Sequence, residues 1–234
     1  SPVQIPGTEW NTVWGGYNGN SAIKSDGTLW VWGPSNKGQM GTNDIVPRSS
    51  PTQLPGTQWS FDKLGGGQEG KTAIKTDGTL WTWGEGEYGK LAHNDNNINR
   101  SSPTQVPGTQ WSDVSGGGFH SSHFLKTDGT LWNVGYGFGG ALAHNDESSR
   151  SSPTQVPGTQ WSYVAAAYYH TVATKTDGTL WAWGYNSSGQ LGVNDKAHRS
   201  SPVQIGGTQW NTGHSYVAAF GNAGGFGIKT DGTL

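Results

Sequence analysis

The chain consists of near-identical copies of one segment, and this repetition constrains its fold more than any other feature. A segment of the type Pro-Gly-Thr-Gln-Trp recurs along the whole length, with tryptophans at Trp10, Trp59, Trp111, Trp161 and Trp210. A second segment, Asp-Gly-Thr-Leu, recurs in step with it at Asp26, Asp77, Asp128, Asp177 and Asp231. A unit of about 50 residues is therefore copied nearly five times. Function is to be sought where the copies differ.

Composition indicates an all-β chain that is rich in loops. Charged residues make up only 13% and glycine accounts for 39 of 234 residues, which excludes a highly charged disordered chain and a long-helix protein. The hydrophobic content of 31% is low, but the 13 tryptophans offset it because each brings a large apolar area. We therefore expect an aromatic core.

Charge and cysteine content exclude several kinds of partner and chemistry. The formal net charge of −2 provides no attraction to nucleic acid or to anionic lipid. The absence of cysteine excludes disulfides and thiolate catalysis. No apolar run has the length of a membrane span, so we expect no membrane insertion. The first residues already belong to a repeat, which predicts either a mature product or a fragment.

One repeat, residues 153–202, predicts four short strands. Pro153 suits an edge strand because it cannot donate to an interior ladder, and a second strand follows around Trp161. Asp177 and Gly178 then join two further strands, since Asp-Gly between apolar stretches is a strong hairpin signal. A polar, glycine-rich loop leads to the next copy. Four antiparallel strands in about 50 residues suit a propeller blade better than a solenoid coil.

The segment LWAWGYNSSGQLG, preceded by YHTVATKTDG and followed by RSSPVQI, resembles the repeat of the regulator-of-chromosome-condensation propeller family. The resemblance covers essentially the whole chain and implies one β-propeller domain over residues 1–234. Well-known members have seven blades, whereas this chain supplies fewer than five repeats. We expect about five four-stranded blades, the last of them incomplete or closed by the N-terminal strand PVQI. A piece of a larger propeller is the alternative.

Polar residues that recur once per unit are predicted to hold the blade rather than a ligand. Lysines precede each Asp-Gly hairpin, arginines precede each Ser-Pro segment, and aspartates end each connecting loop. These columns are Lys24, Lys75, Lys126, Lys175 and Lys229; Arg48, Arg100, Arg150 and Arg199; Asp44, Asp95, Asp146 and Asp195.

Three motifs that suggest chemistry are better explained by the repeat. GEGEYG, residues 84–89, matches a dinucleotide-binding pattern but precedes no helix that would bind a pyrophosphate. His120 and His123 have metal-ligand spacing, but in a strand they point to opposite faces. Glu85 and Glu87 share one loop without an environment that separates their pKa values. We expect no metal, no cofactor and no catalytic group.

The copies differ most in the turn after the second strand of each unit, which we call the crown. Its residues are aromatic or carry amide, carboxylate and imidazole groups, which suits recognition of a protein or sugar surface. The candidate binding residues are Tyr17, Asn18, Gln68, Glu69, Phe119, His120, Tyr168 and Tyr169, together with Trp14, which has Ser115 and Ala165 as counterparts. Neutral variation of exposed turns is the alternative. A second variable set follows the W-x-W-G segment and is expected on another face: Lys37, Glu85, Glu87, Tyr88, Tyr136 and Phe138.

These observations favour a non-catalytic binding or scaffold propeller that recognises a protein or a glycan through its variable loops. A lectin with one sugar site per blade is an alternative, although its ligand residues would have to repeat and the crown does not. A protein inhibitor or exchange-factor-like regulator is allowed by fold analogy alone. Similar repeats in bacterial and phage proteins imply an extracellular or virion-associated module.

Overall fold

The computed structural model describes residues 3–16, 19–67, 69–115, 120–213, 216–221 and 224–233. Four antiparallel sheets of four strands each form successive blades. The first two blades contain β1 (Trp10–Gly16), β2 (Gly19–Lys24), β3 (Leu29–Gly33), β4 (Arg48–Gln53), β5 (Trp59–Gly65), β6 (Gly70–Lys75), β7 (Leu80–Gly84) and β8 (Arg100–Gln105). The next two contain β9 (Trp111–Ser115), β10 (Ser121–Lys126), β11 (Leu131–Gly135), β12 (Arg150–Gln155), β13 (Trp161–Ala166), β14 (His170–Lys175), β15 (Leu180–Gly184) and β16 (Arg199–Ile205).

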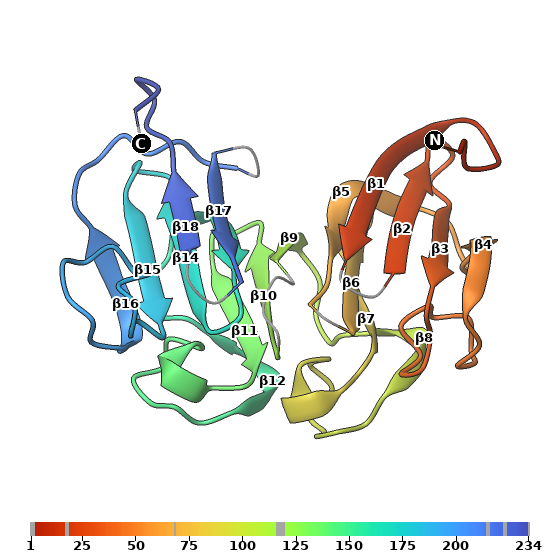
Figure 1. Ribbon diagram of the computed structural model, residues 1–234, viewed down its shortest axis with the longest axis horizontal. Helices are drawn as coiled ribbons and strands as arrows, with labels where there is room; N and C mark the ends of the chain where they lie inside the picture. Colours follow the sequence, from red (N-terminus) through yellow and green to blue (C-terminus); the bar gives the residue numbers. More distant parts are fainter. Residues whose placement is uncertain are drawn as a thin grey trace.

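The fifth blade is incomplete. Its sheet consists of β17 (Val217–Phe220) and β18 (Gly224–Gly227), and an isolated bridge joins Trp210 to Lys229. The all-β propeller with an incomplete last blade, as predicted from the repeats, is thus confirmed. Figure 1 shows the first two blades in the right half of the view and the others in the left half.

The N-terminal segment does not complete that last blade. Residues 3–9 lie outside every strand, and Val3 and Ile5 are exposed. The two ends of the chain lie in opposite halves of the molecule (Figure 1). Closure by an N-terminal strand, one of the two arrangements expected from the sequence, is therefore not what this structure contains.

The repeated Arg-Ser-Ser-Pro segment forms the outermost strand of each complete blade. Strand β12, for example, pairs only with β11 and lies at the edge of its sheet, with Pro153 inside it. The proline is tolerated there because an edge strand leaves one side of its backbone unpaired. The prediction of an edge strand at Pro153 is confirmed.

The Asp-Gly-Thr hairpin is fixed by its own side chains. In the second blade, the Asp77 carboxylate accepts hydrogen bonds from the backbone N–H and the hydroxyl of Thr79, at 2.9 and 2.7 Å. The Trp81 indole N–H then donates to the same hydroxyl at 2.9 Å. Gly78 has φ +78°, and a Cβ there would lie 3.2 Å from the backbone nitrogen of Gln110 in the next blade. Local chemistry and close packing both select this sequence.

The repeated lysines and arginines belong to the frame of the blades, as predicted. The Lys75 ammonium lies 4.8 Å from the Trp59 ring centroid and 4.5 Å from that of Trp81, a pair of cation–π contacts that recurs in the other complete blades. Each repeated arginine forms an ion pair with the repeated aspartate of its own loop, such as Arg100 with Asp95 at 2.6 Å. Both columns therefore stabilise the blades.

Within the W-x-W-G segments, the second tryptophan packs between neighbouring blades. Trp83 and Trp183 are almost fully buried, whereas Trp81 and Trp181 are half-buried. The Trp183 indole N–H donates to the carbonyl of Ala141 in the preceding blade at 3.0 Å. The second tryptophan is thus the one that joins blade to blade.

Candidate binding surface

Both variable sets of loops lie at the same end of the blades. Strand β6 begins at the crown, and antiparallel β7 ends beside that beginning, with Gly70 opposite Gly84. The carbonyl of Glu69 accepts a hydrogen bond from the N–H of Glu85 at 3.0 Å. A Cβ on Gly84 would lie only 2.2 Å from that same carbonyl oxygen, so glycine allows the close approach. The expectation that the two sets occupy different faces is wrong.

The same link recurs in the next two blades. The carbonyl of His120 accepts from the N–H of Tyr136 at 2.9 Å, and the carbonyl of Tyr169 accepts from that of Tyr185 at 2.8 Å. The last crown residue and the first residue of the following loop are therefore held side by side. This backbone link places crown and loop side chains on one surface.

On this surface, five rings from three blades form a continuous row, which we call the ring ladder (Tyr88, Tyr136, Phe138, Tyr185 and His198). Neighbouring ring centroids lie 4.3, 5.8, 5.7 and 4.4 Å apart in that order, and interplanar angles of 25, 9, 24 and 28° make every step a stacked contact. Phe138 remains 39% exposed. Stacked rings of this kind form a rigid, partly exposed aromatic surface.

Two crown residues border the ring ladder. The ring of Tyr169 contacts Phe138 edge-on at 5.4 Å, and the ring of His120 contacts Tyr88 edge-on at 5.0 Å. Tyr168 is half-buried, and its N–H donates to the carbonyl of Gly221 in the fifth blade at 3.0 Å. Four candidate residues lie outside the described part of the chain: Tyr17, Asn18, Gln68 and Phe119.

Two members of the ring ladder were not found from the sequence. Tyr185 occupies the loop position of Glu85 and Tyr136, so aligning the copies at this column would have identified it. His198 stands in the connecting loop next to the repeated arginine, and its ring stacks on Tyr185. No feature of the sequence indicates that His198 stacks on Tyr185.

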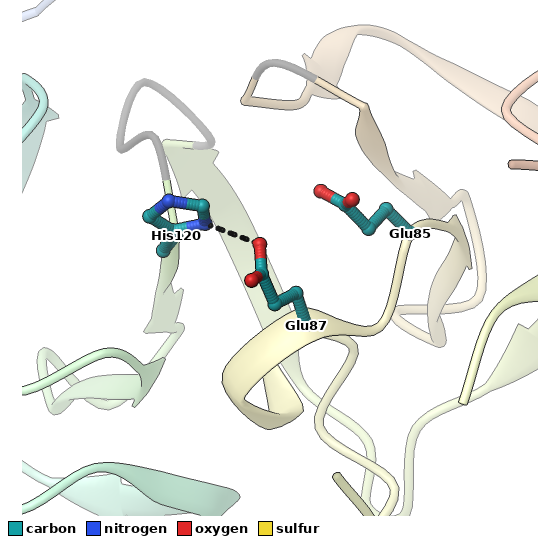
Figure 2. Close-up of side chains that lie close together, drawn as sticks. All are labelled: Glu85, Glu87 and His120. Carbon is teal, nitrogen blue, oxygen red and sulfur yellow. Dashed lines mark ion pairs between the residues drawn. The ribbon is translucent and has the colours of Figure 1, made fainter. Parts of the chain in front are cut away.

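Ionisable groups gather at the Tyr88 end of the ring ladder, and we call them the charged corner (Lys37, Glu69, Glu85, Glu87, Lys90 and His120). The Lys90 ammonium contacts the Glu85 carboxylate at 2.6 Å, and Lys37 approaches the same group at 3.8 Å. His120 Nδ1 lies 3.2 Å from the Glu87 carboxylate, which Figure 2 shows directed at the imidazole.

Burial and neighbouring charges separate the pKa values of the two carboxyl groups. Burial and the negative charge of Glu85 raise the pKa of Glu69. Burial also acts to raise the pKa of Glu85, but its hydrogen bond and ion pair with Lys90 outweigh this, so its pKa falls below the usual value. Glu85 is therefore ionised at neutral pH and is already neutralised by lysine.

Glu85, Glu87 and His120 also have the donor types that bind divalent metal ions, and their ligand atoms lie within 4.8 Å of one another. Glu85 is committed to Lys90 and Lys37, whose positive charges oppose a second cation. His123, whose spacing from His120 would suit a second metal ligand, is fully buried and contacts Ser121 at 3.2 Å. We assign no metal to this cluster.

Trp14 occupies a different place, on the cavity between the innermost strands. This cavity of about 680 Å³ is lined by β1, β5, β9, β13 and β17. The Trp14 ring lies 4.4 Å from the ammonium of Lys71, which is 2% exposed and has no hydrogen-bond partner among the described residues. Trp14 is thus paired with a buried cation rather than with the ring ladder.

Comparison with known proteins identifies the repeat. The family model for the regulator of chromosome condensation (RCC1) repeat matches residues 26–60, 77–122, 128–174 and 177–219. The chain belongs to the RCC1 repeat family. The human E3 ubiquitin-protein ligase HERC2 is 33% identical over 155 residues, which cover 62% of this RCC1-repeat chain but 3% of HERC2.

Solved RCC1-like structures share the fold. Human WBSCR16 superimposes with a TM-score of 0.81 at 21% identity, covering 94% of this chain and 58% of WBSCR16. Prp20p from Saccharomyces cerevisiae gives a TM-score of 0.79 at 18% identity, covering 99% of this chain and 60% of Prp20p. This RCC1-repeat chain therefore spans well under two thirds of both. A bacterial, phage or virion setting stays a prediction.

The part of the chain that the structure describes contains no helix with the length and hydropathy of a membrane span.

Proposed function

We propose that this chain is a non-catalytic protein-binding propeller whose binding surface is the ring ladder with the adjoining crown. The ring ladder is the single observation that carries the proposal. Its rings come from loops in which the blades differ, unlike the tryptophans that follow Pro-Gly-Thr and Asp-Gly-Thr-Leu, which repeat in every complete blade. Rigid, partly exposed aromatic side chains are the residues that most often dominate a protein interface.

The stacking argues for a protein partner rather than a glycan. A single sugar ring would cover one aromatic face, whereas the ring ladder extends over three blades, with Tyr88 and Tyr136 stacked at 4.3 Å and Phe138 offset from its neighbours at 5.8 and 5.7 Å. Their edges and the tyrosine hydroxyls remain to contact a partner, which suits the mixed polar and apolar surface of a protein. The related Prp20p is described with its binding to Gsp1p and histones, which are proteins.

The test is selection of short displayed peptides against the intact chain, followed by affinity measurements on variants. Replacing Tyr136, Phe138 and Tyr185 together by serine is expected to abolish binding of the enriched peptides, because the central rings are lost. The melting temperature should change little, since these side chains lie on loops outside the strand ladders. Parental affinity in the triple variant would contradict the proposal.

Phe61 provides a matched control. It is 40% exposed, against 39% for Phe138, but it lines a depression beside the Asp-Gly hairpins at the other end of the blades. Phe61→Ser should leave peptide binding unchanged. A glycan array run on the parent and the triple variant tests the lectin alternative. A sugar that binds the parent but not the triple variant would show that the partner is a glycan and not a protein.

A further inference from the structure

Two carboxylates of the charged corner, those of Glu85 and Glu87, differ in how their negative charge is balanced. Glu85 lies between Lys90 and Lys37, at 2.6 and 3.8 Å. The Glu87 carboxylate, 40% exposed, forms its ion contact with His120 instead. Among the described residues, His120 is the group that forms an ion contact with Glu87, and it balances the charge of Glu87 only when it carries a proton.

His120 is neutral at neutral pH. Burial lowers its pKa and the Lys90 charge lowers it further, although Glu87 and Glu85 act in the opposite direction. A neutral imidazole does not cancel the charge of Glu87. Glu87 thus presents an uncompensated carboxylate at the surface.

Tyr88 places an aromatic ring directly beside this carboxylate. Tyr88 has φ +56°, the left-handed conformation, at a position where the next blade has Gly139 with φ +64°. Its backbone N–H donates to the Asn97 side chain at 3.2 Å, which holds the strained turn. A non-glycine residue in this conformation costs stability, and such strain is often retained for function.

Within the described part of the chain, a ring stacks on one face of Tyr88. Tyr136 stacks on Tyr88 at 4.3 Å, whereas His120 meets it edge-on. Among the described residues, no second ring stacks on Tyr88. The ring ladder therefore ends at an aromatic face that adjoins a carboxylate.

We propose that this end of the ring ladder binds an arginine side chain of the protein partner, with the guanidinium stacked on Tyr88 and hydrogen-bonded to Glu87. The inference rests on the proposed function and names the chemistry of the partner. A guanidinium is planar, so it can extend the row of stacked rings by one layer while its N–H groups contact the carboxylate. A lysine ammonium has no plane to stack, and a metal ion would compete with Lys90 for Glu85.

The test uses the displayed peptides that bind the intact chain. Each arginine in the enriched peptides is replaced in turn by citrulline, the neutral analogue of the same shape. For the parent protein, one citrulline replacement is expected to weaken binding roughly tenfold, because it removes a cation–π contact and a charge-assisted hydrogen bond. In Glu87→Gln the same replacement should change affinity clearly less than in the parent, because only the cation–π contact with Tyr88 remains.

Tyr88→Gly separates the proposed contact from folding. Glycine suits the left-handed conformation, as at Gly139, so this variant should melt no lower than the parent and yet lose most of the preference for arginine. Glu9→Gln is the matched control, because Glu9 contacts Ser25 beside a hairpin at the other end of the blade. It should keep the full preference.

The outcomes separate this inference from the proposed function. Peptides that require the ring ladder but bind equally well with arginine or citrulline would overturn the arginine site alone. An undiminished preference in Glu87→Gln or Tyr88→Gly would do the same. Peptides indifferent to the ring ladder would overturn the proposed function itself.

Discussion

Replacing Lys71 by methionine should stabilise the fold at neutral pH and remove a rise in stability that the parent shows in mild alkali. Lys71 lies on β6 and is 2% exposed, and its ammonium lies 4.4 Å from the centroid of the Trp14 ring. Methionine keeps the apolar stem of the side chain and removes the charge. The substitution therefore isolates the cost of burying an ammonium that has no hydrogen-bond partner in the described part of the chain.

The magnitude follows from the pKa. Burial lowers the pKa of Lys71 from 10.5 to about 8. At 1.36 kcal/mol per pKa unit, holding the proton in the folded state costs about 3 kcal/mol below pH 8. The Trp14 cation–π contact is worth about 1 to 2 kcal/mol and is lost with the charge. The free energy of unfolding of Lys71→Met should therefore exceed that of the parent by about 1 to 2 kcal/mol near neutral pH.

The pH dependence has a definite sign. Between pH 8 and 10.5 the unfolded chain keeps this proton while folded Lys71 has released it, so the free energy of unfolding rises with pH. From about pH 7.5 to about pH 9.5 the parent should gain about 2 kcal/mol from this group. Burial raises the pKa of Tyr163 to about 12, so ionisation of tyrosine in the unfolded chain lowers stability only above that window.

Denaturant unfolding of both proteins at several pH values is the assay. Lys71→Met should lack the rise that the parent shows, whereas Lys196→Met, which alters an exposed lysine, should retain it. A parent whose unfolding free energy stays flat or falls across this window would refute the reasoning. So would a methionine variant less stable than the parent near neutral pH.

Three further predictions concern the frame. Trp183→Ala should cost about 3 to 5 kcal/mol in denaturant titrations because the ring is fully buried between blades, and the half-buried Trp181→Ala should cost clearly less; equal losses would contradict this. Thr79→Val should cost about 1 kcal/mol at neutral pH, and denaturant titrations should show this difference from the parent shrinking in acid, because the Thr79 hydrogen bonds hold the pKa of Asp77 below its usual value and their contribution is lost as Asp77 takes up a proton. Removing residues 1–5 should leave the melting temperature within about 2 °C, and a larger fall would show that this segment pairs with a blade.

The frame could be predicted from the sequence because its interactions are local and repeated. The contacts of Asp77 with Thr79 and of Thr79 with Trp81 span two residues each, and every complete blade repeats them. The two strands of each hairpin could therefore be predicted from the Asp-Gly turn sequence without knowledge of any tertiary contact. Closure of the last blade was harder to predict, because it depends on whether distant ends of the chain meet.

The proposed binding surface was predicted only in part, for a reason of geometry. Tyr136 and Phe138 were identified as variable, but they were assigned to another face than Tyr169. Strands alternate in direction, so the turn before β10 and the loop after β11 must emerge at the same end of the sheet. Applying this alternation to the predicted strands would have united the two sets. The stacking of His198 on Tyr185 depends on the path of a long loop, which no local pattern encodes.

The two ends of each blade differ in what their aromatic residues contact. At the hairpin end, the tryptophans are held by lysine ammonium groups and threonine hydroxyls of their own blade, so these contacts recur unchanged from copy to copy. At the other end, rings of the second to fourth blades contact one another within and between blades in the described part of the chain. Substitutions at the hairpin end therefore alter stability, because they remove contacts on which the blade depends. The residues of the ring ladder lie outside the strand pairs, so they can change while the propeller remains folded.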